Sequence, residues 1–219
     1  VGFAIEKCAY SPLRTAPRMS VMISAIGVSY LLQNLVCYVT GGLAKQFPDI
    51  PLISQSIRVF GVKDKLAVFI SPLVAVVLMV ILVLIINHTK FGMSMRAVSK
   101  DFETAQLMGI KINSVISFTF IIGSALAAVA SFLYFSNYTT IAPASGAMPG
   151  LKAFVAAVFG GIGSIPGAVI GAFIIGICEN LLKGMKLTAF SDAFTFALLI
   201  VILVVKPTGL FGEKLTEKV

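Results

Sequence analysis

The chain has 219 residues, of which 58% are hydrophobic and 12% charged, and its formal net charge is +8. Soluble domains carry about 25% charged residues, so this composition argues against a soluble globular protein. The basic residues lie in short connections between apolar segments, as membrane-helix flanks do, which argues against a nucleic-acid-binding protein. The three cysteines and the single histidine suggest neither a disulfide framework nor a metal site.

Long stretches without acidic or basic residues separate the charged segments. These stretches are residues 19–44, 66–89, 112–151 and 153–178. Uncharged apolar stretches of about 18 residues or more are candidates for membrane helices. A spanning chain must satisfy its backbone hydrogen bonds internally, and the alternating segments of an outer-membrane barrel are missing from the sequence. The sequence therefore predicts an all-α fold, a polytopic bundle of transmembrane helices in a single membrane domain over residues 1–219.

Five helices of this bundle can be placed along the chain. Their predicted ranges are residues 19–38, 66–87, 113–135, 168–182 and 189–205. Gly41 and Gly42 end the first helix, and Pro207 and Gly209 end the last. An alternating stretch at residues 55–59 predicts a strand in the first long loop.

The start of the chain, residues 1–5, has the character of an apolar helix end and not of a signal peptide. We therefore expect the chain to lack the N-terminal helices of the complete protein. Placing residues 1–20, 88–112 and the tail in the cytoplasm, with residues 151–182 crossing twice, puts more Lys and Arg inside than outside. This is the bias of the positive-inside rule.

Residues 95–108 have the pattern of an amphipathic helix, with apolar residues every three or four positions and charged residues between them. We predict Ser99 as its N-cap and Gly109 as a left-handed C-terminal cap, while Asp101 and Glu103 suit the positive helix start. The pattern leaves two interpretations open. The helix either rests on lipid headgroups or inserts into a partner protein.

A glycine-rich stretch interrupts the apolar residues 151–182, which are too many for one crossing. We expect a short helix, a break and a second helix. The residues that interrupt the helical pattern are Gly160, Gly161, Gly163, Ser164, Pro166 and Gly167. Beyond the break, Gly167 and Gly171 share one helical face, which predicts close helix packing.

Three segments resemble permeases of the branched-chain amino acid ABC importers. Residues 154–170, FVAAVFGGIGSIPGAVI, are the most specific match, and residues 6–14 resemble the family's Glu-Arg-x-Ala-Tyr-Arg-Pro-Leu-Arg connection. The family's cytoplasmic loop is matched in order by Gly92, Arg96, Ala97, Asp101, Ala105, Gly109 and Ile110. In addition, the segment from Glu103 to Gly109 is similar to the EAA-x-x-x-G loop of ABC importer permeases.

The resemblance implies a permease subunit of an ATP-driven importer for branched-chain amino acids, in the bacterial inner membrane. Its cytoplasmic coupling helix would dock into an ATPase through Arg96, Asp101, Glu103, Ala105 and Gly109. The implied partners are cytoplasmic ATP-binding subunits, a second, related permease subunit, an extracellular or periplasmic substrate-binding protein and the lipid membrane. No cofactor is expected on this chain, which has no P-loop motif, so the partner ATPase would use the ATP.

Helix breaks in membranes often mark the substrate path, because freed backbone groups must be buried or line a water-filled cavity. We accordingly assign the translocation path to Gly160, Gly161, Gly163 and Pro166.

Other function classes fit the residues less well. An enzyme needs a nucleophile with a base or a ligand cluster, and the chain offers one histidine and scattered acids, of which Glu179 and Asp192 are interpreted as membrane-boundary residues. The alternative is an ion-coupled secondary transporter of amino acids, although the apolar segments lack the charged residue that ion coupling usually needs. A channel would need a filter segment, and none stands out.

Overall fold

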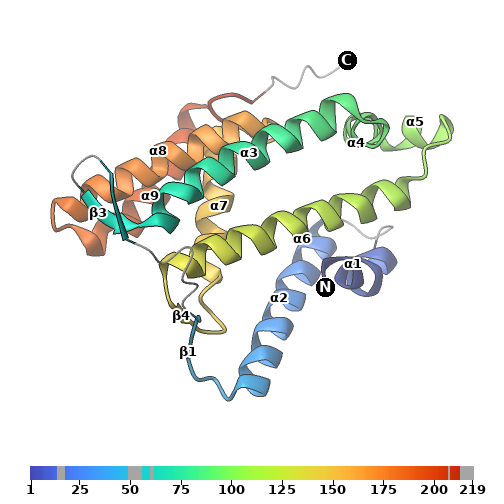
Figure 1. Ribbon diagram of the computed structural model, residues 1–219. Helices are drawn as coiled ribbons and strands as arrows, with labels where there is room; N and C mark the ends of the chain where they lie inside the picture. Colours follow the sequence, from blue (N-terminus) through green and yellow to red (C-terminus); the bar gives the residue numbers. More distant parts are fainter. Residues whose placement is uncertain (14–17, 49–55, 60–61, 207, 213–219) are drawn as a thin grey trace. The chain divides into compact units, whose positions relative to one another are not determined.

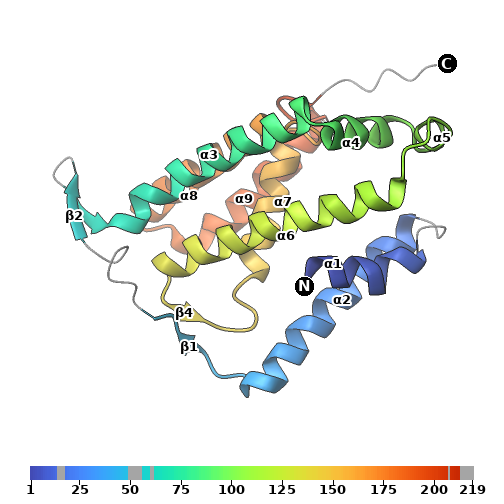
Figure 2. The ribbon, with the colours of Figure 1, turned by 45° about the vertical axis from the view of Figure 1, so that its right-hand side comes forward.

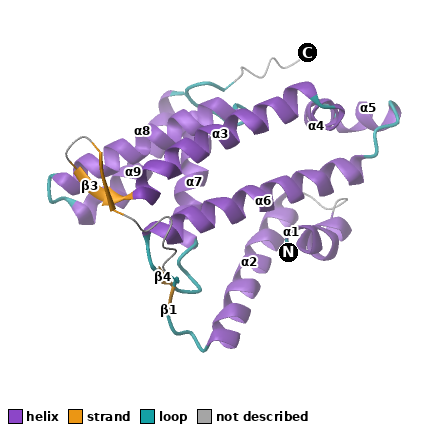
Figure 3. Cartoon of the chain, in the orientation of Figure 1, coloured by secondary structure: helices purple, strands orange, loops and turns teal. Residues whose placement is uncertain are grey.

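The structure of the chain, a computed structural model, describes residues 1–13, 18–48, 56–59, 62–206 and 208–212. The chain divides into two compact units, Val1–Ala144 and Ser145–Val219. Both consist mainly of helices, drawn in purple in Figure 3. Within the described ranges, the short strands all belong to the first unit.

Five helices in the described part of the chain are long and apolar enough to cross a membrane (Figure 1). They are α2 (Arg18–Thr40), α3 (Leu66–His88), α6 (Ile112–Asn137), α8 (Ile165–Gly184) and α9 (Thr188–Val205). Each covers one predicted transmembrane range and extends it by one to five residues. The structure is thus consistent with the predicted polytopic bundle of membrane helices.

Short helical turns at the start of the first unit pack on α6. They are α1 (Gly2–Ile5) and a π-helical turn (Glu6–Tyr10), which a 3-10 turn (Ser11–Leu13) follows. Gly2 lies so close to Ser124 of α6 that a Cβ would overlap the serine hydroxyl. Glu6 is fully buried, and its Oε2 accepts a hydrogen bond from Ser117 Oγ at 2.8 Å. A glycine contact and a hydrogen-bonded buried carboxylate therefore hold these turns against α6.

Two antiparallel strand pairs lie in the loops of the first unit. They are β1 (Lys45–Gln46) with β4 (Thr140–Ile141), and β2 (Ser56–Val59) with β3 (Val62–Lys65). Figure 2 shows β1 and β4 side by side. In the register of this pair, Lys45 lies opposite Ile141. The strand predicted at residues 55–59 is confirmed over the length of β2, and Gln55 lies outside the described residues. The sequence gives no signal for β3, because three of its four residues are charged.

The second unit is an antiparallel helical hairpin, α7 (Ala147–Gly160) with α8, on which α9 packs. Buried apolar side chains of α7 and α8 form its core, and partly buried side chains of α9 pack against them. The core residues are Val155, Ala156, Phe159 and Ile175. The expected short helix is present but begins at Ala147, ahead of residue 151. Pro149 falls in its first turn, where a proline removes no helical hydrogen bond.

Candidate functional site

The amphipathic segment predicted as one helix at residues 95–108 is in fact two helices. α4 (Lys90–Lys100) and α5 (Phe102–Leu107) meet at Asp101, whose backbone is extended with φ −153° and ψ 112°. The single-helix prediction is therefore wrong. An aspartate side chain readily accepts hydrogen bonds from nearby backbone N–H groups, which favours the N-cap of a new helix. The spacing of apolar residues continues past Asp101 and gives no sign of this break.

Asp101 is the N-cap of α5. Its Oδ1 accepts a hydrogen bond from the backbone N–H of Thr104 at 3.0 Å, and its Oδ2 accepts one from the Thr104 hydroxyl. The hydrogen bond from the Thr104 hydroxyl, and to a lesser extent the one from the Thr104 amide, lowers the pKa of Asp101 below the usual value for an aspartate. The carboxylate thus stays ionised at the positive end of α5.

The predicted N-cap at Ser99 is wrong, because the Ser99 hydroxyl donates to the Arg96 carbonyl oxygen within α4 at 2.9 Å. The left-handed cap at Gly109 is confirmed, with φ 80°. The N–H of Gly109 donates to the Gln106 carbonyl at 3.0 Å, and the N–H of Ile110 donates to the Ala105 carbonyl at 3.1 Å. These two bonds form a Schellman motif that satisfies the last carbonyls of α5.

α4 is attached to both α3 and α6. The Arg96 Nη1 donates to Asn87 Oδ1 near the end of α3 at 3.1 Å. Gly92 approaches α3 so closely that a Cβ would overlap the Ile86 carbonyl. On α6, the Phe118 ring stacks on the Phe91 ring with centroids 4.6 Å apart. Arg96, predicted to contact an ATPase, therefore also joins α4 to α3.

α5 presents an exposed apolar tip beyond a buried alanine. Ala105 is buried, and α5 contacts α4 and α6. Leu107 and Met108 are 87% and 79% exposed, and Phe102 and Glu103 are exposed beside them. Of the residues predicted to contact an ATPase, Asp101, Ala105 and Gly109 thus shape the helix, and Glu103 lies on its surface. We call Phe102, Glu103, Leu107 and Met108 the α5 tip.

The glycine-rich break lies between α7, which ends at Gly160, and α8, which begins at Ile165. Gly161 and Gly163 have φ of 112° and 98°, values that favour glycine. The Ser164 side chain caps α8 by accepting from the Gly167 N–H at 3.2 Å. Pro166 was expected to interrupt the helix, but it lies in the first turn of α8, where its missing N–H costs nothing.

Backbone contacts between glycines join α7 to α8. A Cβ on Gly160 would overlap the Gly167 carbonyl, and a Cβ on Gly171 would lie 2.7 Å from the Ala156 carbonyl oxygen. Gly163 differs, since no described heavy atom lies within 4 Å of its Cβ position. The structure therefore brings Gly160, Gly167 and Gly171 together and leaves Gly163 open.

The segment after α9 completes the end of α7. The N–H groups of Leu210 and Phe211 donate to the carbonyls of Phe159 and Gly160, each at 2.9 Å. The Cα of Gly161 lies only 2.5 Å from the Cβ position of Gly209. These residues satisfy helix-end carbonyls that the break leaves without partners. Nothing in the sequence pattern pairs these two segments, which lie far apart along the chain.

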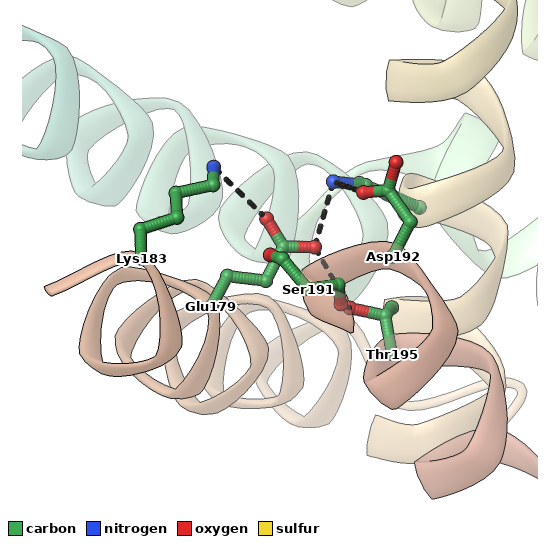
Figure 4. A network of polar contacts seen from close by, with 6 residues as sticks. Glu179, Lys183, Ser191, Asp192 and Thr195 are labelled. Atoms are coloured by element: carbon green, nitrogen blue, oxygen red, sulfur yellow. Dashed lines mark hydrogen bonds and ion pairs between the residues drawn. The ribbon is translucent and has the colours of Figure 1, made fainter. Parts of the chain in front are cut away.

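At the other end of the hairpin, four charged side chains of α7, α8 and α9 form a polar cluster (Figure 4). Lys152 Nζ lies 2.7 Å from Glu179 Oε1 and 2.7 Å from Asp192 Oδ1. Lys183 Nζ lies 3.7 Å from Glu179 Oε2. The Thr195 hydroxyl donates to Glu179 Oε1 at 2.8 Å. These contacts join all three helices of the second unit.

Interpreting Glu179 and Asp192 as boundary residues missed this cluster. Glu179 is only 8% exposed, because it lies five residues before the end of α8 and faces α7 and α9. The available signal is Lys152, the sole charge between residues 112 and 178 of the sequence. An isolated lysine between long apolar stretches needs a partner, and the nearest acid downstream is Glu179.

Comparison with known proteins places the chain in a family. A family model described as "Branched-chain amino acid transport system / permease component" matches residues 8–203. The high-affinity branched-chain amino acid transport system permease protein LivH of Escherichia coli is 41% identical over 224 residues, covering 100% of this chain and 72% of the relative. Its counterpart BraD of Pseudomonas aeruginosa is 39% identical with the same coverage.

A probable LivH of Methanocaldococcus jannaschii is 30% identical over 201 residues, covering 89% of this chain and 62% of the relative. No solved structure matches the chain. With five long apolar helices among its described residues, the chain is a multi-pass protein of the inner (cell) membrane and a transport subunit. It belongs to the family of permease components of branched-chain amino acid transport systems.

Proposed function

We propose that the chain forms part of the translocation path for branched-chain amino acids in an ATP-driven importer, and that α5 couples it to a separate ATPase. The observation that carries this proposal is the α5 tip. A helix capped by side chain and glycine at its two ends holds Leu107 and Met108 almost fully exposed. Exposed apolar side chains at the end of a rigid element are typical of a protein contact.

The attachments of α4 supply a route for mechanical coupling. A displacement of α5 would pass to α4 and from there to α3 through the Arg96–Asn87 bond and the Gly92 contact. It would pass to α6 through the stacked rings of Phe91 and Phe118. Closure of the ATPase would thus move two of the long apolar helices of the first unit.

The glycine-rich break is proposed to contribute to the path. Gly163 supports this, because it is exposed and no described atom crowds its Cβ position. Gly160 and Gly161 are buried, so they would contribute by holding the turn in place, and Pro166 by starting α8 on its surface. Gly167 and Gly171 would serve helix packing.

The family and the relatives support the proposed partners. We propose cytoplasmic ATP-binding subunits, a second, related permease subunit and an extracellular or periplasmic substrate-binding protein, with residues 1–219 acting as one membrane domain. The E. coli and P. aeruginosa relatives carry branched-chain amino acid transport in their names, which supports the substrate class. ATP would be bound and hydrolysed on the ATPase and not on this chain.

Copurification tests the coupling. The full permease is purified from membranes with its ATPase, comparing wild type with Glu103→Arg and Leu107→Asp in the α5 tip. Leu43→Asp is the matched control, because Leu43 is also an exposed leucine but follows α2. We expect both α5 variants to insert normally and to lose the ATPase, while the control keeps it.

Retention of the ATPase by both α5 variants would contradict the proposal. Loss of the ATPase by the control as well would mean that the exposed leucines act on insertion or folding and not on coupling.

A further inference from the structure

The polar cluster of Lys152, Glu179, Lys183 and Asp192 is balanced in charge. It contains two ammonium groups and two carboxylates, and Lys152 lies between the carboxylates at 2.7 Å from each. A simple cation would compete with the Lys152 ammonium for the same oxygens, and an anion would meet two carboxylates. A ligand that carries one positive and one negative charge can instead replace contacts within the existing ion pairs and leave the net charge of the cluster unchanged.

Ser191 supplies an unused hydrogen-bonding group beside this cluster. It is 1% exposed, and its Oγ has no hydrogen-bond partner among the described residues. Ser191 lies one turn before Thr195 on α9, and the Thr195 hydroxyl, which donates to Glu179 Oε1 at 2.8 Å, also lies 3.2 Å from the Ser191 carbonyl oxygen (Figure 4). Leaving a buried hydroxyl without a hydrogen-bond partner costs about 1–3 kcal/mol, so such a group in a native structure calls for an explanation, and a ligand that binds to it is one.

The cluster is buried on one side and open on the other. The Glu179 side chain is 11% exposed and that of Lys152 is 26% exposed, whereas those of Lys183 and Asp192 are 44% and 49% exposed. The ion pairs can therefore be reached from the side of Asp192 and Lys183, and Glu179 and Ser191 lie on the buried side of the cluster.

We infer that this cluster binds the zwitterionic head of an α-amino acid, an inference that rests on the proposed function. The ligand carboxylate accepts hydrogen bonds from the Lys152 ammonium and displaces Asp192 from it. The ligand ammonium donates to the carboxylates of Glu179 and Asp192 and to Ser191 Oγ. No covalent bond changes, and the side chain of the ligand makes no contact with the charges, so the site recognises the head group and not the aliphatic part.

Direct binding tests the site without the substrate-binding protein. The full permease, assembled with its partner permease and ATPase in nanodiscs, is titrated with radiolabelled leucine. Two competitors each lack one charge: leucinamide has no carboxylate, and 4-methylpentanoate has no ammonium. Ser191→Ala removes one hydroxyl and keeps every ion pair. Thr188→Ala removes an exposed hydroxyl one turn earlier on α9 and is the matched control.

We expect saturable leucine binding that neither competitor displaces. Ser191→Ala should bind leucine about tenfold more weakly, the worth of one hydrogen bond to a charged group. Thr188→Ala should bind like wild type. Glu179→Gln should abolish binding while leaving insertion and ATPase association intact.

The site would be overturned if Ser191→Ala and Glu179→Gln both bound leucine with wild-type affinity. It would also be overturned if the singly charged analogues displaced the label as well as unlabelled leucine does, or if no saturable binding were found. ATP-dependent leucine uptake by the wild-type preparation is measured in parallel. If uptake is present while the site variants bind normally, the head-group site is wrong and the importer function stands. If uptake itself is absent, the proposed function fails.

Discussion

The backbone N–H of Phe211 donates to the carbonyl oxygen of Gly160 at 2.9 Å, so a residue beyond α9 completes the end of α7. Gly161 lies against this segment with φ 112°, and Gly163 has φ 98° but no described neighbour at its Cβ position. An alanine at either position would strain the backbone. Only at Gly161 would the new Cβ also collide with neighbouring atoms.

Gly161→Ala should therefore release the segment of residues 208–212, because the new Cβ would overlap the Gly212 backbone. Hydrogen–deuterium exchange of the Leu210 and Phe211 amides should accelerate. Gly163→Ala, with a similar strain of about 1 kcal/mol, should leave these amides protected. Equal acceleration in both variants would mean that strain alone, and not the contact, controls the segment.

The packing of α8 on α7 predicts different effects for two glycines of one helix. Gly171→Ala would place its Cβ 2.7 Å from the Ala156 carbonyl oxygen, and we expect a loss of about 1–3 kcal/mol in stability. Gly176 has no described neighbour within 4 Å, so Gly176→Ala should gain up to about 1 kcal/mol from helix propensity. Thermal unfolding of both variants in detergent measures the difference, and equal melting temperatures would contradict close packing at Gly171.

Removing Lys152 should be more damaging than removing the whole ion pair. Lys152→Met leaves the buried Glu179 carboxylate with a more distant lysine, at a cost of about 3 kcal/mol. The double variant with Glu179→Gln should recover most of that loss, because no charge remains buried. Thermal unfolding of wild type, Lys152→Met, Glu179→Gln and the double variant gives the four stabilities of a double-mutant cycle. Additive losses would show that the two side chains do not interact in the folded protein.

The Asp101 cap predicts a dependence of α5 on pH. Because Thr104 lowers the pKa of Asp101 in the folded chain, the cap stabilises α5 at pH values above the unfolded pKa of about 3.9. This contribution is lost as the pH falls through the lower, folded pKa. NMR titration of the Asp101 carboxyl should give a midpoint below that of an ordinary aspartate, and Thr104→Val should raise it. A midpoint at or above the ordinary value in wild type would rule out the cap.

Local patterns in the sequence were sufficient to predict the long helices and the break between α7 and α8. Uncharged apolar runs predict the long helices, and clustered glycines predict the break. The α5 cap was harder, because the apolar period continues through Asp101 and only the side-chain bond to Thr104 divides the helix. Pro166 was assigned to the break and lies in the first turn of α8, where proline is tolerated.

The partners in the polar cluster and in the contact of Phe211 with Gly160 were harder to identify for another reason, although the isolated Lys152 marks the cluster in the sequence. Both join residues distant along the chain, and hydropathy and periodicity describe neighbours only. The late position of Glu179 in α8 predicts a boundary residue, whereas its partners on α7 and α9 decide its environment.

Leucine uptake by the assembled transporter shows whether this chain works in an ATP-driven importer. Proteoliposomes containing the permease, its partner permease, the ATPase and the binding protein are given radiolabelled leucine. We predict saturable uptake that requires ATP, persists when proton and sodium gradients are collapsed, and disappears with Leu107→Asp. Uptake that proceeds without ATP and follows an ion gradient would contradict the account and identify a secondary transporter.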